Sequence, residues 1–228
     1  MTLAEPTPQL GSSGTRIYDY RDPLTLSRWL EGLLGLYIVV RAAAFIVDLL
    51  QLKLLDLAGT VSSSQFQTWA EASDQREQIV AVLFLAVLVI TVVVFACWIV
   101  RANRNARALG AVRMTFSPGW SVGWYFVPIV SLWKPFQAMR EIWKASVNPT
   151  GWKSLPTDPL IGWWWAAFVL SCITGQASFR MPTNTLDQLS ASSVVSMIDD
   201  GVDIVATALA LLLVERLCRI QRARMTAA

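Results

Sequence analysis

The chain has 228 residues, of which 54% are hydrophobic and 15% are charged, and its formal net charge is +3. Soluble domains are about 25% charged, so this composition excludes an ordinary soluble enzyme. The apolar residues stand in blocks of about 20, the length of helix that crosses roughly 30 Å of hydrocarbon. Histidine is absent, which removes the usual general base and the commonest metal ligand. We therefore predict an all-α integral protein of the cell membrane, without a catalytic, metal or cofactor site.

The N-terminal end is predicted to be a tail followed by a helix. Residues 1–22 are polar and rich in Pro, Gly, Ser and Thr, which favours disorder. Asp22 and Pro23 then suit a helix start, because an aspartate caps a helix and a proline fits its first turn. The first span is predicted at about residues 30–50.

The second span is the cleanest apolar run, at about residues 79–100. A polar stretch, about residues 60–78, separates it from the first span. Asp74 and Glu77 have the spacing of a capping box and are predicted to open the second helix. The valines and isoleucines of the run would favour a strand in water, but the run is far too long for a strand.

The segment of residues 117–146 is too short and too interrupted to cross a bilayer. Its apolar part, residues 120–133, contains Pro128, so we predict a re-entrant or interfacial segment. Pro135 is expected to start a short amphipathic helix. The predicted apolar face of this helix holds Phe136, Met139, Ile142 and Trp143, and the predicted polar face holds Gln137, Arg140, Glu141 and Lys144.

Two further spans follow this segment. Asp158 and Pro159 repeat the pattern of a capping aspartate and a first-turn proline. The third span is predicted at about residues 160–175 and the fourth at about residues 194–214. The predicted fold class is an all-α, four-transmembrane-helix bundle, with the proline-broken segment and the short amphipathic helix on its cytoplasmic side.

The basic residues predict the orientation of the bundle. Fifteen of the 19 Lys and Arg residues lie before the first span, between the second and third spans, or after the fourth. By the positive-inside rule, both termini and the middle loop are then cytoplasmic. The membrane domain is predicted to cover residues 23–222, and a cytoplasmic tail of residues 223–228 ends the chain.

Charged residues inside the predicted spans are costly and often functional. Arg41 and Asp203 are each 13 residues from a basic residue at the cytoplasmic end of their helix, so they lie at a similar depth. Asp200 shares a helix face with Asp203, and Asp48 shares one with Arg41. We hypothesise that Arg41 pairs with Asp203, Asp200 or both. Such a pair would fix helix packing or form part of a path for a solute or proton.

Three classes of partner other than the bilayer can be considered. Arg101, Arg104 and Arg107 close the second span and could attract anionic lipid, at roughly 1 kcal/mol for each residue near the surface. Small residues in the third and fourth spans could support a homo-oligomer or contact with another membrane protein. A nucleic-acid partner is excluded, because the basic residues lie against the membrane without a recognisable reading module.

The part of the chain between the second and third predicted spans, which we call the middle segment, also carries the residues of a known family. These residues are Pro118, Gly119, Gly123, Trp124, Tyr125, Phe126, Pro128, Leu132, Trp133, Pro135, Phe136, Gln137, Glu141 and Trp143. In this spacing they resemble the signature of an uncharacterised bacterial membrane family, the domain of unknown function 4328, which is common in actinobacteria. The likeness extends over about residues 28–222. It implies a multi-span membrane domain and no activity.

Two functions remain open from the sequence. The first is a non-enzymatic scaffold or regulatory protein that binds a partner or lipid through the cytoplasmic residues 114–158. The second is an oligomeric transporter or channel for a small solute or ion, with a path formed by Arg41, Asp48, Asp200 and Asp203. An aspartyl protease is disfavoured, because the three aspartates 199, 200 and 203 lie on one helix and the glycine-rich motif of such enzymes is absent.

Overall fold

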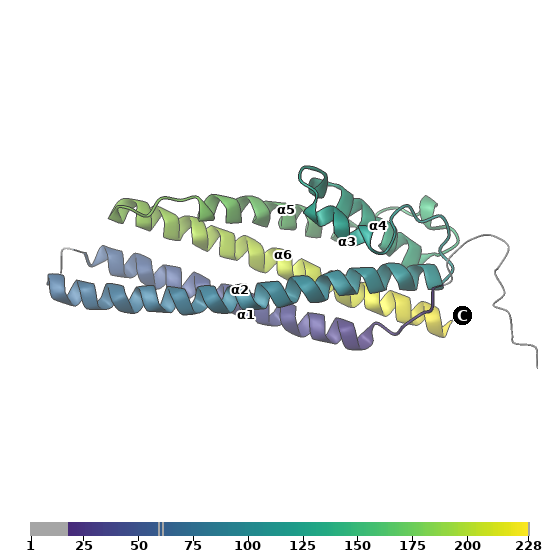
Figure 1. Ribbon diagram of the computed structural model, residues 1–228, viewed down its shortest axis with the longest axis horizontal. Helices are drawn as coiled ribbons and strands as arrows, with labels where there is room; N and C mark the ends of the chain where they lie inside the picture. Colours follow the sequence, from purple (N-terminus) through teal and green to yellow (C-terminus); the bar gives the residue numbers. More distant parts are fainter. Residues whose placement is uncertain (1–17, 59, 61, 228) are drawn as a thin grey trace, which may run out of the picture.

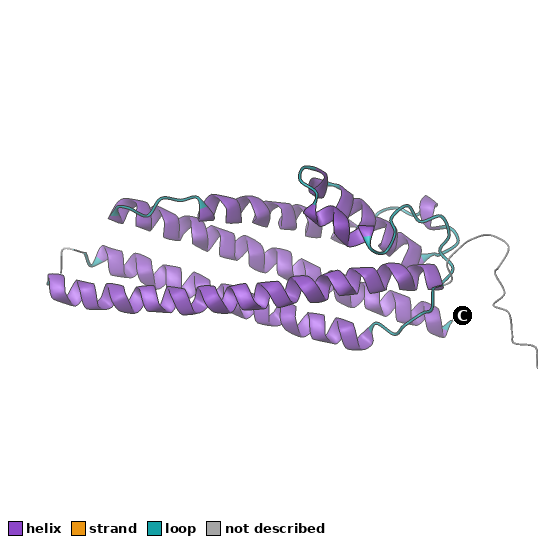
Figure 2. Ribbon diagram, in the orientation of Figure 1, coloured by secondary structure: helices purple, strands orange, loops and turns teal. Residues whose placement is uncertain are grey.

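The computed structural model describes residues 18–58, 60 and 62–227, and in these residues it contains helices and loops but no strand (Figure 2). Four long helices run side by side: α1 Leu24–Asp56, α2 Ser63–Ala108, α5 Pro159–Phe179 and α6 Leu186–Thr226 (Figure 1). The shorter elements lie between α2 and α5 in the chain: α3 Trp120–Gly123, η1 Trp124–Phe126, η2 Val130–Leu132, α4 Lys134–Val147 and η3 Trp152–Ser154.

The long helices form two hairpins. The α1–α2 turn and the α5–α6 loop lie at one end of the bundle, which we call the hairpin end (Figure 1). The short helices α3 and α4 lie toward the opposite end, together with the last turns of α6, and we call this the terminal end. α6 packs along both α1 and α5, and α1 also packs along α2, whereas α2 and α5 share few contacts among the described residues. The bundle is therefore loosely closed between α2 and α5.

Three helices, α1, α2 and α5, are long and apolar enough to cross a membrane. Many large apolar side chains of α2 point outward, including Val82, Leu83, Leu85 and Val89, as expected of a surface that faces lipid. The fourth predicted span, residues 194–214, lies inside the 41-residue α6. This span differs from the other three because three aspartates, at positions 199, 200 and 203, interrupt its apolar run.

One predicted helix start is wrong and another is right. Asp74 and Glu77 do not open the second helix, since both lie within α2, which starts at Ser63. The cap is the hydroxyl of Ser62, which accepts from the Gln65 N–H at 3.4 Å. The polar stretch before the apolar run therefore extends the helix, because Gln, Glu and Ala are good helix formers whether or not they contact lipid. The Asp158 carboxylate caps α5 as predicted, accepting from the Leu160 N–H at 2.9 Å.

The structure describes part of each predicted tail, residues 18–22 and 223–227. Residues 1–17 lie outside the described part of the chain. Residues 18–22, predicted to be disordered, are held against α2. Asn105 accepts from the Arg21 N–H at 3.1 Å and donates to the Arg21 carbonyl at 2.9 Å. At the other end, α6 continues through the predicted tail to Thr226.

A buried polar network joins α2, α4 and α6 at the terminal end. Gln221 is 1% exposed, and its amide donates to the Ala102 carbonyl and to the Ser146 hydroxyl, both at 2.9 Å. Its carbonyl accepts from Asn105 at 3.3 Å. The main buried apolar cluster takes residues from the same three helices and from α1, among them Leu30, Trp98, Ile142 and Leu217. The network therefore positions α4 relative to the ends of α2 and α6.

Replacing Gln221 should weaken the terminal end. Gln221→Ala leaves the Ala102 carbonyl and the Ser146 hydroxyl without their donor, so we expect a loss of about 2–4 kcal/mol in the free energy of unfolding. Thermal unfolding in detergent would measure it, with the exposed Gln75→Ala as the matched control. A loss no larger than that of the control would contradict a structural role for Gln221.

Candidate functional site

A buried ion cluster lies between α1 and α6. The guanidinium of Arg41, in α1, contacts three carboxylates of α6. Its nitrogens lie 2.5 Å from Asp199 Oδ2, 3.0 Å from Asp200 Oδ1 and 2.8 Å from Asp203 Oδ2. Arg41 is 8% exposed and Asp200 is 2% exposed, so these contacts are shielded from solvent. One positive charge therefore faces three negative groups in the interior of the bundle.

The sequence predicted part of this cluster. Arg41 was expected to pair with Asp203, Asp200 or both, and the structure places both within ion-pair distance. Asp199 was missed as a partner, although it forms the shortest of the three contacts. Its position relative to Asp203, one helical turn away on the same face of α6, was the signal that could have identified it.

Neighbouring side chains complete the cluster from all four long helices. The Tyr37 hydroxyl, in α1, donates to Asp203 at 2.8 Å, and the Thr174 hydroxyl, in α5, donates to Asp199 at 2.5 Å. The ring of Phe84, in α2, lies 4.8 Å from the Arg41 guanidinium in a cation–π contact. The cluster thus connects α1, α2, α5 and α6 at one level of the bundle.

A cavity of about 220 Å³, the polar pocket, reaches the cluster from the hairpin end. Arg41, Asp199 and Asp200 form its inner wall, and Asp48 and Glu77 also line it. Asp48 forms no ion pair among the described residues. The sequence grouped Asp48 with Arg41, and the structure places both on this pocket without a direct contact. Two buried atoms here, Arg41 Nε and Asp200 Oδ2, have no hydrogen-bond partner in the described part of the chain.

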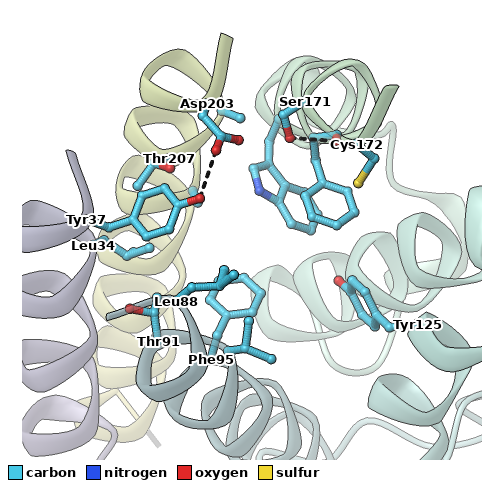
Figure 3. A pocket seen from close by; sticks show the side chains of 15 residues that line it. Leu34, Tyr37, Leu88, Thr91, Phe95, Tyr125, Ser171, Cys172, Asp203 and Thr207 are labelled. Carbon is cyan, nitrogen blue, oxygen red and sulfur yellow. Dashed lines mark hydrogen bonds between the residues drawn. The ribbon is translucent and has the colours of Figure 1, made fainter. Parts of the chain in front are cut away.

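A second cavity of about 290 Å³, the lateral pocket, lies between α2 and α5 (Figure 3). Its lining is mainly apolar and includes Leu34, Leu88, Phe95, Trp164, Phe168 and Ala206. The hydrogen-bonded pair of Tyr37 and Asp203 forms part of one wall, and Tyr125 from the middle segment contributes another (Figure 3). The hydroxyls of Thr91 and Tyr125 are buried and have no hydrogen-bond partner among residues 18–58, 60 and 62–227.

The backbone of Phe116 anchors the middle segment, because its carbonyl bonds to α2 and its N–H bonds to α4. The Phe116 N–H donates to Glu141 at 3.3 Å, and the Phe116 carbonyl accepts from Asn103 at 3.1 Å and from Arg107 at 2.9 Å. Asn103 also donates to the Ser121 hydroxyl at 2.8 Å. Asn103 was not singled out in the sequence, because an amide at the end of an apolar run has no distinctive pattern.

The structure corrects the predicted solvent face of α4. Glu141 was placed on the polar face, but it is buried and accepts a hydrogen bond from the Phe116 backbone. Burial raises the pKa of Glu141 above its ordinary value, and the Phe116 N–H opposes this effect. The predicted apolar residues Met139, Ile142 and Trp143 are buried. α4 therefore has a wide buried face that includes one carboxyl group.

The remaining signature residues shape the segment around this anchor. Pro118 and Pro135 are buried, Pro128 is exposed, and Gln137 and Trp124 are partly buried. Gly119 precedes α3, and Trp133 precedes α4 and is exposed. A Cβ atom on Gly123 would lie 2.9 Å from the Trp120 ring, so only glycine fits without a shift. Pro135 and Gln137 thus belong to α4, and the other residues named here lie in the short elements and turns before it.

The three arginines at the end of α2 differ in role. Arg107 donates to Asn103 at 3.0 Å as well as to the Phe116 carbonyl, so it belongs to the anchor of the middle segment. Arg104 is exposed and Arg101 is partly exposed. Among the described residues, no group of three or more His, Cys, Asp and Glu side chains is placed to hold a metal ion.

These features define an all-helical protein with three membrane-type helices and a buried arginine–aspartate cluster. The chain matches the family described as Domain of unknown function (DUF4328) over residues 63–219 and belongs to that family. The resemblance seen in the signature is thereby confirmed. The matched region includes the three aspartates of the cluster but not α1, which supplies Arg41. No curated protein and no solved structure matches the chain.

Removing the cation of the cluster should be strongly destabilising. Arg41→Leu leaves buried carboxylates without their counter-charge, so we expect a loss of about 3–5 kcal/mol in the free energy of unfolding in detergent. Arg41→Lys keeps the charge but forms fewer contacts, and its loss should be smaller. Arg219→Leu breaks an exposed ion pair with Glu215 and serves as control, with little expected effect. Equal losses in Arg41→Leu and Arg219→Leu would contradict the importance of the cluster.

The buried carboxyl of Glu141 should make stability depend on pH. Because its pKa is raised in the folded state, the folded state favours protonated Glu141, and this stabilisation is lost as the pH rises through the raised pKa. Glu141→Gln cannot ionise. The difference between its melting temperature and that of the wild type should therefore shift in favour of the variant as the pH rises from about 4.5 to about 8. The exposed Glu71→Gln is the control. A pH-independent difference for Glu141→Gln would argue against a raised pKa.

Proposed function

We propose that the protein is a non-enzymatic, four-span protein of a bacterial cell membrane that binds a lipid in the lateral pocket. The observation that carries the proposal is an apolar cavity between two membrane-type helices that share few contacts. A lipid could enter such a cavity sideways from the bilayer. Tyr125 connects the pocket with residues 114–158, the part of the chain expected to recognise a lipid or partner.

The proposed fourth span is α6, despite its acidic residues. An aspartate at the centre of a membrane helix costs roughly 2.5–3.5 kcal/mol, so three would oppose insertion strongly. Their contacts with Arg41 offset part of this cost, because each carboxylate gains a charged donor and faces the interior of the bundle. With four spans and the observed bias of basic residues, both termini are cytoplasmic.

The middle segment is proposed to lie at the membrane interface. Phe126 is 74% exposed and Ile129 is 72% exposed, and both precede the Leu132 carbonyl, which accepts from Trp165 at 3.0 Å. Ile129 has φ +65° and lies at the centre of a tight turn. A hydrogen bond of 2.7 Å from the Val130 N–H to the Pro128 carbonyl closes this turn. The turn presents apolar side chains outward beside α5, which suits insertion between lipid chains near the headgroups.

The lining of the lateral pocket suits a lipid with an uncharged polar end. Apolar side chains dominate it, and the unpaired hydroxyls of Thr91 and Tyr125 supply hydrogen bonds to an ester or hydroxyl oxygen. The Asp203 carboxylate in the wall already contacts Arg41 and Tyr37. Anionic headgroups are proposed to bind elsewhere, at the exposed Arg104 and the partly exposed Arg101.

The second candidate function is an oligomeric transporter or channel. It is favoured by the polar pocket, which reaches Arg41 and Asp200 from the hairpin end, while the lateral pocket reaches Asp203 from the other side. A path would then run through the cluster and would require Arg41 to move. Uptake into proteoliposomes that depends on Asp48 or Asp200 would favour this function over lipid binding.

Filling the lateral pocket should remove the bound lipid. Cys172 lines the pocket and is exposed, so Cys172→Trp should occupy the entrance without disturbing the buried core. Cys97→Trp is the matched control, because Cys97 is also exposed but does not line the pocket. Mass spectrometry of lipids that copurify from native membranes should show about tenfold less lipid with Cys172→Trp than with Cys97→Trp. Equal retention by both variants, or no lipid on the wild type, would contradict the proposal.

A further inference from the structure

We propose that the polar pocket binds a small, water-soluble organic cation, namely a primary ammonium with a neighbouring hydroxyl or carbonyl oxygen, as in an amino alcohol. This site is distinct from the lateral pocket, and binding there does not depend on the proposed lipid. Three observations carry the proposal: the charge of the lining, the two unpaired buried atoms, and the mixed apolar and polar character of the walls.

The charge of the polar pocket favours a cation. Besides the aspartates that contact Arg41, its lining contains Asp48 and Glu77, which come from α1 and α2. Arg41 is the one basic residue of the lining. The acidic side chains therefore outnumber the guanidinium in a partly buried cavity, where charges are weakly screened. An added cation reduces this imbalance, whereas an anion or a phospholipid headgroup would meet Asp48 and Glu77 at close range.

The two unpaired atoms define the hydrogen bonds that a ligand should form. Asp200 Oδ2 is an acceptor in a side chain that is 2% exposed, and Arg41 Nε is a donor in a side chain that is 8% exposed. Both residues line the polar pocket, and because these two atoms are almost fully covered, a ligand contacts them only when the two side chains shift slightly. An ammonium donates to Asp200, and an oxygen two or three bonds from the nitrogen can accept from Arg41. A simple metal ion would satisfy Asp200 but not the Arg41 donor.

The size and walls of the polar pocket suit an organic molecule. A cavity of about 220 Å³ exceeds the space needed by a single water or ion. Its walls combine methyl groups of Ala44, Val47 and Val80 with the hydroxyls of Ser178 and Ser196. These two hydroxyls are hydrogen-bonded to each other at 2.8 Å and lie between α5 and α6. A short carbon chain with polar ends matches this distribution.

Ethanolammonium chloride is the probe for the test, titrated calorimetrically into the purified full chain in detergent at pH 7. Saturable binding to the wild type is expected. Asp48→Asn and Glu77→Gln each remove one charge of the lining without touching the Arg41 contacts, and each should weaken binding by about tenfold. Asp74→Asn is the matched control, because Asp74 is an exposed acid of α2 outside the pocket, and it should bind like the wild type.

Choline tests the predicted hydrogen bond, since it keeps the charge and the hydroxyl but has no N–H donor. We expect choline to bind at least tenfold more weakly than ethanolammonium. The proposal is overturned if ethanolammonium does not bind the wild type, if both lining variants bind as tightly as Asp74→Asn, or if choline binds as well as ethanolammonium. Because Glu77 is only half-buried, Glu77→Gln remains informative if Asp48→Asn does not fold.

Discussion

The contact of one arginine with three aspartates is the interaction on which the rest of the bundle depends. Buried charges persist in a low-dielectric interior only when they are paired and hydrogen-bonded. Arg41 brings α1 against α6, while Thr174 and Phe84 bring α5 and α2 to the same level. α6 packs along α1 and α5, and its aspartates point toward these neighbours. In the proposed four-span topology, the need to keep these charges away from hydrocarbon explains why α6 packs between α1 and α5.

The two pockets follow from the same arrangement. With α6 held between α1 and α5, α2 packs mainly on α1 and leaves the lateral pocket on its α5 side. Between the cluster and the hairpin end, small and acidic side chains line the polar pocket without filling it. The middle segment limits the lateral pocket through Tyr125. The family signature thus describes the part of the chain that shapes one cavity.

Features that depend only on chain geometry were predictable from the sequence, whereas the partners of individual side chains were predictable only in part. Apolar run lengths indicated the membrane-type helices, and the helical rise placed Arg41 level with Asp203, because both depend only on chain geometry. Asp199 was missed, since the pairing depends on how far α6 is rotated toward α1. The cap at Asp74 and the solvent face for Glu141 were wrong for a related reason. An acid has the same local pattern whether it caps a helix, faces solvent or accepts from a distant backbone N–H.

Whether the cluster keeps α6 in the membrane can be measured directly by labelling the α5–α6 loop. Thr183→Cys would be placed in a chain whose native cysteines, Cys97, Cys172 and Cys218, are replaced by Ala. A membrane-impermeant maleimide applied to spheroplasts should label this cysteine from outside when Arg41 is present. Labelling should fall sharply with Arg41→Leu and return when the three aspartates are also changed to Asn. Equal labelling with and without Arg41, or no outside labelling of the parent chain, would contradict this role of the cluster.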